Sequence, residues 1–557
     1  MTADRVDEAG GEDAGDDART GVRGWIPEAP RVPVPDADGI RLLRDDLTGY
    51  TVDDLGALLG PTATSALDRG HLLPASRRVA SALRRGGFAG GPAALMALFM
   101  LSQALPRRQV EAALPRLGVD GAQRMGLVVA SGHDSDDEVR PLVDLQPYAA
   151  VDAGGTAQWW IVSDLPSRPG AGPLPVDHVL GVGGASLMLA GSTIRRPVAR
   201  VLDVGTGCGV QALHAARHAS EVTGTDVSAR ALHFARFTWA LNSGPDPDRP
   251  GPDGRTSRLQ LRQGSLLEPV AGEEFDLVVS NPPFVITPRR AAVPLYEYRD
   301  GGVVGDELVR RLVTGVGAVL APGGVAQLLG NWEHHRGQPW QERVSSWLEA
   351  CGLDGWIVQR EVQDAAEYAE TWIRDGGQEE GQAFDALHDA WLDDFETRQV
   401  DAVGFGLITL RRPADGGPGT LRRVEEIRTP AAGPLGGHLE ACLAAEDWLR
   451  AEAATDGALA AARLRVAADV TEERHYRPGD EDPQVIVLRQ GGGFGRGVRA
   501  STALAGLVGA CDGELTVGRL IAALAELLGV PADGLASELL PAVRRLVADG
   551  LLVPPSG

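Results

Sequence analysis

One stretch of the sequence constrains the fold more than any other, because an apolar run leads into three glycines on alternate residues. The run begins at Val201, and the helix-like segment Val-Gln-Ala-Leu follows the last glycine. Glycines permit a tight turn that a ligand can approach closely, and the following helix offers unpaired N–H groups. The sequence therefore predicts a buried strand, a ligand-binding turn and a helix in this order. The candidate binding residues of the turn are Asp203, Gly205, Thr206, Gly207 and Gly209.

Alternating strands and helices surround this turn, which is the pattern of a mostly parallel α/β sheet. We expect strands at residues 200–205, 221–227, 258–263, 275–280, 324–329, 355–362 and 403–410. A connector rich in Pro, Gly and Asp is expected at residues 244–256. A further insertion at residues 363–400 contains Tyr368, Trp372 and Trp391 and is expected to be helical.

A carboxylate after the second strand indicates a ribose-containing cofactor. Asp226 lies 21 residues after Gly205, where a carboxylate can accept hydrogen bonds from both ribose hydroxyls. A dinucleotide turn of spacing G-x-G-x-x-G would need Gly or Ala at the position of Val210, so the spacing disfavours NAD and FAD. Further candidate cofactor contacts are Val227, Ser265, Leu266 and Asn281.

With these residues in this order, the segment from about residue 170 to residue 412 resembles the class I S-adenosylmethionine (SAM)-dependent methyltransferases. The resemblance implies a Rossmann-like domain of seven strands and SAM as the cofactor. It places the glycine turn around the methionine part of SAM and Asp226 on the ribose. The residue that usually contacts the adenine amino group in that family is often Asp, and it is Ser265 here.

The fourth predicted strand ends in the motif Asn281-Pro282-Pro283-Phe284. Consecutive prolines hold the backbone rigid and lack N–H donors, so their carbonyl groups can face a ligand. The Asn281 side-chain oxygen and the Pro282 carbonyl can accept the two hydrogens of a planar NH2 group. Phe284 can lie against the attached plane. Such a loop would act by holding the nitrogen in line with a donor methyl group, so these four residues are the candidate catalytic set.

The motif specifies a planar nitrogen and leaves its carrier open. Methyltransferases of adenine and guanine amino groups in rRNA and DNA share it with those of protein glutamine amides. The segment from Asp300 to Gly305 is similar to one in the release-factor glutamine methyltransferases. We therefore expect a protein glutamine as the methyl acceptor. An exocyclic base amine in RNA (rRNA or tRNA) or in DNA is the alternative, and a non-catalytic SAM-binding scaffold is the second alternative.

Two further domains are expected on either side of the methyltransferase domain. Helix-like segments followed by two strand-like ones precede it, and a second, mixed α+β region follows it. Both regions are compatible with winged-helix-like units. The expected divisions are a disordered acidic leader at 1–35, a mainly helical winged-helix-like domain at 36–168, the methyltransferase domain at 169–415 and an α+β domain with a winged-helix-like end at 430–557.

Charge is distributed unevenly along the chain. The formal net charge is -23, yet residues 60–130 hold nine Arg against three acidic residues. Four of these arginines have the spacing of one helix face, which we interpret either as a solvated face or as a docking face for an acidic partner such as nucleic acid. They are Arg77, Arg78, Arg84 and Arg85.

Composition excludes several classes of protein. All 53 basic side chains are arginine, so Schiff-base, Walker A and protein-kinase chemistries lack their lysine. The four cysteines are far apart, and His214 and His218 lack a third ligand, so we expect no disulfide framework and no metal site. His214 and His218 are expected on a helix surface, whereas His334 and His335 are candidate substrate contacts. Without an apolar leader or a long apolar stretch, we expect a cytoplasmic protein with no membrane partner.

Overall fold

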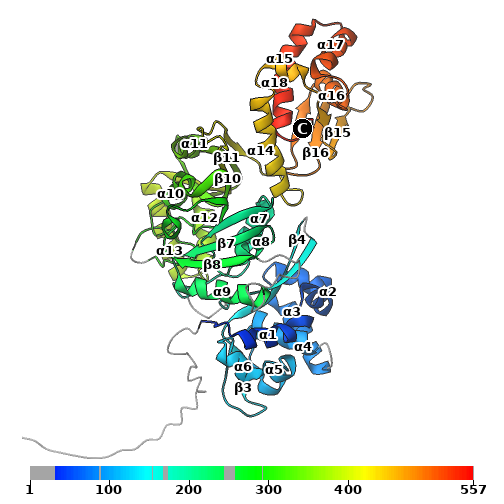
Figure 1. The fold of residues 1–557 in the computed structure, drawn as a ribbon. Helices are drawn as coiled ribbons and strands as arrows, with labels where there is room; N and C mark the ends of the chain where they lie inside the picture. Colours follow the sequence, from blue (N-terminus) through cyan, green and yellow to red (C-terminus); the bar gives the residue numbers. More distant parts are fainter. Residues whose placement is uncertain are drawn as a thin grey trace, which may run out of the picture.

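The computed structural model describes residues 32–86, 90–152, 155–166, 174–243, 257–290 and 293–555. Three units follow one another along an elongated molecule, from blue through green to red in Figure 1. The predicted connector and almost all of the predicted leader lie outside the described residues. The domain boundaries and the winged-helix likeness stay predictions.

The central unit is built on one eight-stranded sheet with the order β13-β11-β12-β10-β9-β6-β7-β8. Neighbouring strands run parallel except for β12, which pairs antiparallel with β10 and β11. The chain leaves β6 toward β7 and β8 and returns as β9 on the other side of β6, so β6 and β9 flank a topological switch point. The strands are β6 (Val198–Val204), β7 (Ala219–Asp226), β8 (Arg258–Gln263), β9 (Phe275–Ser280), β10 (Leu320–His335), β11 (Asp354–Asp364), β12 (Val400–Arg411) and β13 (Arg422–Glu426).

The class of fold is confirmed, but the expected number of seven strands is wrong. The additional strand, β13, pairs in parallel with β11 at the edge of the sheet. Its sequence, Arg-Arg-Val-Glu-Glu, lies half-buried to exposed and lacks the apolar alternation by which the other strands were predicted. It also follows residue 415, where the methyltransferase domain was expected to end, so the sheet extends beyond that point.

Helices cover both faces of the sheet, because alternate side chains of each strand point to opposite faces. In β6, Leu202 and Val204 belong to the core on one face and Val201 to the core on the other. The first core is closed by α10 (Glu307–Gly315) and α11 (Trp340–Cys351). The second core contains residues of α7 (Gly184–Ser192) and α8 (Val210–Ala216). Helix α9 (Ala229–Ser243) follows β7, and short 3-10 turns lie at Glu268–Val270 and Val316–Val319.

The insertion is helical, as expected. It consists of α12 (Ala365–Asp375) and α13 (Gln382–Thr397), between β11 and β12. Apolar side chains of both helices pack against Val285 and Ile286, which directly follow the Asn-Pro-Pro-Phe motif. The insertion therefore supports the loop that carries the candidate catalytic residues.

The N-terminal unit is mainly helical, with a small sheet and a long hairpin. Its hydrophobic core is continuous with α8 and α9 of the central unit, and the hairpin packs along α9. Trp160 donates its indole N–H to the Tyr50 carbonyl at 2.7 Å. The elements are α1 (Ala37–Asp46), a 3-10 turn (Leu47–Gly49), α2 (Val52–Asp68), α3 (Leu72–Arg85), α4 (Gly90–Leu95), a π-helical turn (Met96–Met100), β1 (Leu105–Pro106), α5 (Arg107–Ala113), α6 (Gly118–Arg124), β2 (Val128–Ala130), β3 (Glu138–Pro141), β4 (Asp144–Asp152) and β5 (Gly155–Ser163).

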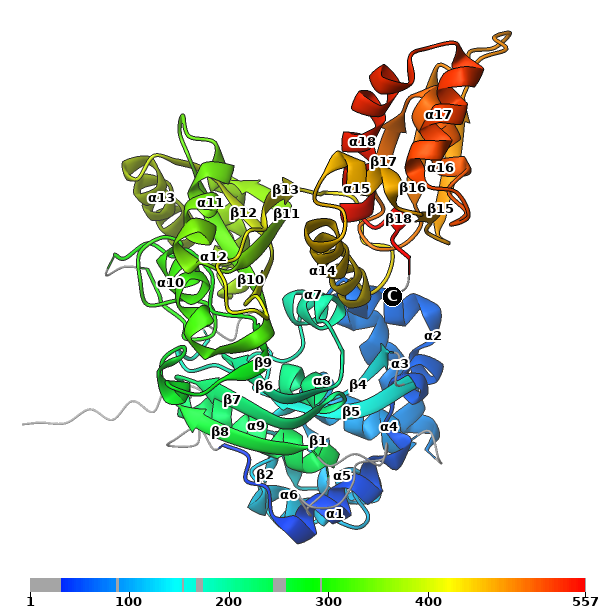
Figure 2. The ribbon, with the colours of Figure 1, turned by 45° about the horizontal axis from the view of Figure 1, so that its top comes forward.

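The C-terminal unit has a hydrophobic core of its own. It begins with α14, which lies beside α7 between the central sheet and the rest of the unit (Figure 2). The glycine-rich segment after residue 490 is the turn between antiparallel β16 and β17. The elements are α14 (Gly436–Ala451), α15 (Asp456–Ala461), β14 (Arg465–Val466), β15 (Val470–His475), β16 (Val485–Gln490), β17 (Gly497–Ala500), α16 (Thr502–Gly509), α17 (Val517–Leu528), α18 (Ala532–Ala548) and β18 (Leu552–Val553).

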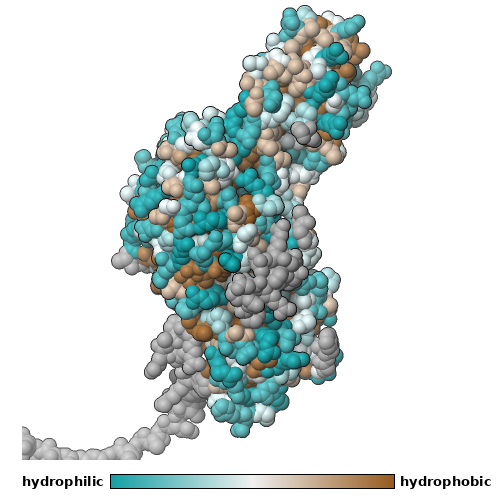
Figure 3. Space-filling model, viewed as in Figure 1, coloured by the Kyte–Doolittle hydropathy of each residue, from teal (hydrophilic) through white to brown (hydrophobic). Residues whose placement is uncertain are grey.

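Figure 3 shows hydrophilic and hydrophobic residues mixed over the face in view. The most exposed large apolar side chain among the described residues is Leu527, at 83%. Among the same residues, no helix is both long enough and apolar enough to cross a membrane.

Candidate active site

The glycine turn connects β6 to α8 in a conformation that suits glycine. Gly205, Gly207 and Gly209 have φ angles of 73°, 53° and 85°, in the left-handed region that side chains disfavour. A Cβ atom on Gly209 would lie 3.1 Å from the Ala235 Cα, so this glycine also permits close packing of the turn on α9. A Cβ on Gly207 would meet no atom within 4 Å, so this part of the turn leaves room for a ligand.

Asp203 lies beneath the turn and is fully buried. Its Oδ2 accepts a 2.7 Å hydrogen bond from the Thr206 hydroxyl. Its Oδ1 has no partner among the described residues. Burial raises the pKa of Asp203 to about 7, although the Thr206 bond acts against this shift. The unpartnered oxygen is therefore an acceptor that a bound ligand can use.

Asp226 joins the glycine turn to the loop after β7. Its Oδ2 accepts from the Gly207 amide at 3.0 Å and its Oδ1 from the Ser228 amide at 2.9 Å. Burial raises its pKa, and these two amides partly offset that effect. Each carboxylate oxygen can accept more than one hydrogen bond, so Asp226 keeps the capacity to bind a diol. The adjacent Val227 is 56% exposed.

The loop after β8 is held beside Asp226. The Gly264 amide donates to the Asp226 carbonyl at 3.0 Å, and the Gln263 side chain donates to the Val227 carbonyl at 3.1 Å. Leu266 has a φ of 48°, an uncommon conformation for a residue with a side chain. Ser265 and Leu266 thus lie in a fixed loop next to the carboxylate, where the resemblance placed the adenine contact.

The Asn-Pro-Pro-Phe loop meets the glycine turn across the switch point. A Cβ on Gly205 would lie 3.8 Å from the Asn281 carbonyl oxygen. The side-chain Oδ1 of Asn281 is buried and has no partner among the described residues. An unpaired buried acceptor is costly, so its presence indicates a ligand that donates a hydrogen bond there.

The aromatic residue at the end of the motif packs against β12 and α12. Phe284 lies half-buried, with its ring centroid 5.3 Å from that of Phe405 and 6.5 Å from that of Trp372. Pro282 is buried and Pro283 half-buried. The loop is thus held by β12 and by α12, and the four predicted residues lie together after β9.

Several predictions outside this site have a different outcome. His214 and His218 are both buried, not on a helix surface. The N-terminal hairpin covers His214 on α8, and His218 lies just beyond the end of that helix. The His214 ring lies between the Tyr148 hydroxyl at 2.8 Å and the Arg195 guanidinium at 3.0 Å, and burial lowers its pKa to about 3. His334 Nε2 lies 2.8 Å from the Gln359 side-chain oxygen, and its ring stacks on Trp340, so its substrate contact stays a prediction.

The loop that contains Asn281-Pro282-Pro283-Phe284 and continues through Ile286 is called the acceptor loop. Sequence reasoning missed two residues that hold this loop. Tyr368 and Asn331, from the insertion and from β10, meet behind the motif, with 2.6 Å between the Asn331 Nδ2 and the Tyr368 hydroxyl. The insertion's aromatic residues were the one signal available, and they do not reveal where the insertion packs.

The four Arg of the predicted docking face are exposed on α3, in the N-terminal unit. No group of three metal-ligating side chains occurs among the described residues.

Comparison with protein families assigns the central segment to a known domain. The methyltransferase small domain family matches residues 182–338. Two other families, each described as a domain of unknown function, match residues 47–142 and 440–554. These last two matches lie in the flanking units.

Curated relatives are similar over the same central region. The release factor glutamine methyltransferase of Deinococcus radiodurans is 33% identical over 239 residues, which are 40% of this chain and 79% of that enzyme. The ribosomal protein uL3 glutamine methyltransferase of Bradyrhizobium diazoefficiens is 33% identical over 31% of this chain and 55% of that enzyme. The ribosomal RNA small subunit methyltransferase C of Alcanivorax borkumensis is 33% identical over 28% of this chain and 39% of that enzyme. The chain thus spans about half or less of the length of these last two relatives.

Solved structures match at low overall similarity. A 16S rRNA methyltransferase of T. thermophilus in complex with AdoMet and guanosine is 18% identical over 46% of this chain and 60% of that chain, with a TM-score of 0.24. A ribosomal protein L11 methylase of Lactobacillus delbrueckii is 18% identical over 40% of this chain and 75% of that chain, with a TM-score of 0.22.

The domain match and the residues at the carboxyl ends of β6, β7 and β9 define a class I SAM-dependent methyltransferase. The chain belongs to the methyltransferase family that includes the release factor glutamine methyltransferases, because it covers more than two thirds of the Deinococcus radiodurans enzyme at 33% identity.

Proposed function

We propose that this chain binds SAM and methylates the side-chain amide nitrogen of a glutamine in a protein. The observation that carries the proposal is the buried, unpartnered Oδ1 of Asn281 beside the glycine turn. A primary amide has a planar NH2 group that can donate one hydrogen to this oxygen and the other to the Pro282 carbonyl. Phe284 then limits the space beside the amide plane.

The residues of the glycine turn fit the proposed cofactor. Asp203 offers an unpartnered carboxylate oxygen, and Gly207 leaves open space where a side chain would intrude. Asp226 would accept from the ribose hydroxyls, and Ser265 and Leu266 would border the adenine. When bound, SAM supplies a methyl group on a positively charged sulfur.

The chain's own contribution to the reaction is to bind and orient the acceptor. Asn281 and Pro282 fix the direction of the acceptor nitrogen by holding both of its hydrogens. Forming the N–C bond makes the nitrogen acidic, and one N–H proton leaves to solvent, so no strong base is required. Correct placement of two reacting groups accounts for a large part of such a rate enhancement.

The charge of the insertion supports a protein acceptor over a nucleic acid. Between Asp364 and Arg398 the chain has eleven acidic residues and two arginines. This segment packs directly behind the acceptor loop. An acidic surface beside the site repels a polyanion and favours a neutral or basic polypeptide. The names of the glutamine methyltransferase relatives agree with this choice.

A base amine in RNA or DNA is the second candidate. It is supported by the exposed arginines of α3, and one relative is named as a ribosomal RNA methyltransferase. If Arg77 and its neighbours bind phosphates, the affinity for RNA should fall steeply with salt concentration.

The test uses the full chain with tritiated SAM and an extract of cells that lack it. We expect label that survives RNase and DNase and is lost to protease. Label lost to RNase or DNase would replace the proposed acceptor with a nucleic acid. Asn281→Ala should keep the SAM affinity within about twofold and lower methyl transfer about 100-fold or more, by analogy with the loss of one preorganised hydrogen bond. Equal label with Asn281→Ala would contradict the proposed role of the loop.

A further inference from the structure

The acceptor loop is supported by β12 of the sheet and by the insertion. After β9 the chain passes through the motif and runs on as Val285 and Ile286, both buried. These two residues pack against α12 and α13 and belong to the same hydrophobic cluster. Among the residues of that cluster, Tyr368 has a polar group that points at the loop backbone.

The Tyr368 hydroxyl is a junction of three segments. It accepts a 3.0 Å hydrogen bond from the Ile286 amide and a 2.6 Å hydrogen bond from the Asn331 side chain. Tyr368 is 3% exposed, and Asn331 and Ile286 are each 1% exposed. Water therefore cannot readily replace these hydrogen bonds. Burial raises the pKa of Tyr368, so the phenol stays neutral.

The neighbouring amide of the loop is also tied to α12. Val285 donates its N–H to the Arg299 carbonyl at 2.8 Å. The Arg299 guanidinium in turn donates to the Trp372 carbonyl at 2.6 Å and to Asp375 at 2.9 Å. Both backbone amides after Phe284 therefore depend on one helix of the insertion.

The same face of α12 contacts the aromatic residue of the motif. Trp372 follows Tyr368 by four residues, which places the two side chains on one helix face. Their ring centroids are 6.0 Å apart, and Trp372 meets the Phe284 ring edge-on. Any shift of α12 would move the Phe284 ring and the loop backbone together.

We propose that Tyr368 is a positioning residue for methyl transfer. It holds the acceptor loop where Asn281 and Pro282 can orient the acceptor nitrogen toward the methyl group. The inference rests on the proposed function only for its effect on turnover. The Tyr368 hydroxyl accepts from Ile286 and Asn331 behind the motif, so we assign it to the loop backbone and not to a ligand. Its effect is thus confined to the acceptor side, because the SAM side is formed by the loops after β6, β7 and β8.

The test compares Tyr368→Phe with Tyr50→Phe as a matched control. Tyr50 is also fully buried, and its hydroxyl donates one hydrogen bond, to the Leu145 carbonyl at 3.2 Å in the N-terminal unit. Hydrogen exchange of the Ile286 amide should become about tenfold faster in Tyr368→Phe, while the 203–213 segment is unchanged. Turnover with tritiated SAM should fall about 10-fold to 100-fold with SAM affinity within twofold. Tyr50→Phe should lower the Tm without either effect.

Each outcome decides the proposal. Unchanged exchange at Ile286 overturns it, and so does faster exchange with unchanged turnover. A parallel loss of SAM affinity would show a general structural role and would also overturn it. If the wild-type chain transfers no methyl group at all, the proposed function fails, and the exchange measurement still decides whether Tyr368 holds the loop.

Discussion

The two flanking units join the methyltransferase sheet in different ways. The N-terminal unit shares one hydrophobic core with α8, α9 and Cys208, so it packs against the back of the glycine turn itself. The C-terminal unit has a separate core and reaches the sheet through α14 and through Phe494 in the turn between β16 and β17. One of its polar anchors lies at Asp354, the first residue of β11, and another joins Arg423 and Glu425 of β13 to Asp549 and Arg496. The candidate site residues lie at or just beyond the carboxyl ends of β6, β7, β8 and β9, so the anchor at Asp354 lies at the opposite edge of the sheet.

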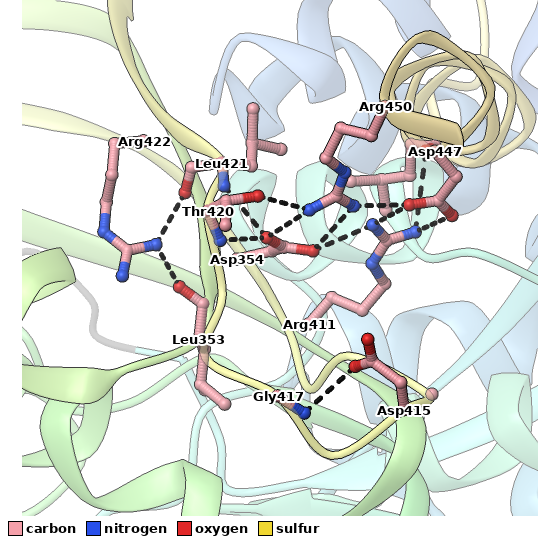
Figure 4. Close-up of polar contacts among 12 residues, drawn as sticks. Leu353, Asp354, Arg411, Asp415, Gly417, Thr420, Leu421, Arg422, Asp447 and Arg450 are labelled. Atoms are coloured by element: carbon pink, nitrogen blue, oxygen red, sulfur yellow. Dashed lines mark hydrogen bonds and ion pairs between the residues drawn. The ribbon is translucent and has the colours of Figure 1, made fainter. Parts of the chain in front are cut away.

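Figure 4 shows this anchor in detail. Asp354 is fully buried and accepts from Arg411 at 2.8 Å and from Arg450 at 3.2 Å. The Thr420 and Leu421 amides donate to it at 2.8 and 2.9 Å. The comparison teaches that the N-terminal junction supports the glycine turn of the proposed cofactor site, whereas the C-terminal junction lies away from it.

The largest expected effects come from truncating a buried side chain in each of the two cores. Both changes should lower stability, but only the one in the N-terminal core should weaken SAM binding. Phe234→Ala removes a fully buried ring of α9, next to the residue on which Gly209 packs, and should lower the free energy of unfolding by about 3–5 kcal/mol. It should also weaken SAM binding about tenfold, because the glycine turn loses its support. Leu539→Ala in the C-terminal core should cost about 2–5 kcal/mol and leave SAM affinity unchanged. Calorimetry for stability and titration with SAM measure both. Equal SAM affinity in the two variants would show that the N-terminal core does not support the glycine turn more than the C-terminal core does.

A smaller effect is expected at the charged anchor. Asp354→Ala leaves the Arg411 and Arg450 cations without their buried partner and should lower the free energy of unfolding by about 3 kcal/mol. Asp447→Ala removes a half-exposed carboxylate from the same group and should cost less than about 1 kcal/mol. Urea unfolding gives both values. Neither variant should change turnover, and a loss of turnover in Asp354→Ala would show that this edge reaches the site.

The contributions of Asp354 and Asp203 to the pH dependence of stability should have opposite signs. Burial raises the pKa of Asp354, but the Leu421 amide and the two arginines outweigh it and lower the pKa to about 2. Its stabilising contribution is therefore complete above about pH 4 and lost as the pH falls toward 2. The raised pKa of Asp203, about 7, has the reverse effect, since the folded state then loses stability as the pH rises from about 4 to 7.

Scans of Tm against pH can resolve these contributions. Asp203→Asn should flatten the change between about pH 4 and 7, and Asp354→Asn should flatten the change below about pH 4. Burial also raises the pKa of Asp144 to about 7, so each variant must be compared with the wild type, which keeps that contribution. Unchanged profiles would show that these carboxyl groups do not titrate as stated.

The smallest effect is expected on the surface of the N-terminal unit. Arg77→Ala combined with Arg84→Ala should change the free energy of unfolding by less than about 0.5 kcal/mol, since both side chains are exposed. Labelling of a protein acceptor should stay within twofold of the wild type. A large, salt-dependent loss of labelling would instead support the nucleic-acid alternative.

Much of the fold and of the site could be predicted from the sequence because the signals are local. Gly207 and Asp226 lie at fixed places after strands, and the predicted 258–263 and 275–280 strands agree with β8 and β9. The strand β13 was missed because four of its five residues are charged. His214 was misplaced because its helix is covered by a hairpin more than fifty residues away in the chain.

The sequence by itself determined the class of enzyme, since the glycine turn and Asn281-Pro282-Pro283-Phe284 each contain their chemistry within a few residues. Only the tertiary structure decided what holds that chemistry in place. The Tyr368 hydroxyl reaches Ile286 across 82 residues of chain, and no spacing rule predicts such a contact. The physical reason is that a turn is set by local backbone preferences, whereas a buried hydrogen bond between distant segments exists only after the core has packed around it.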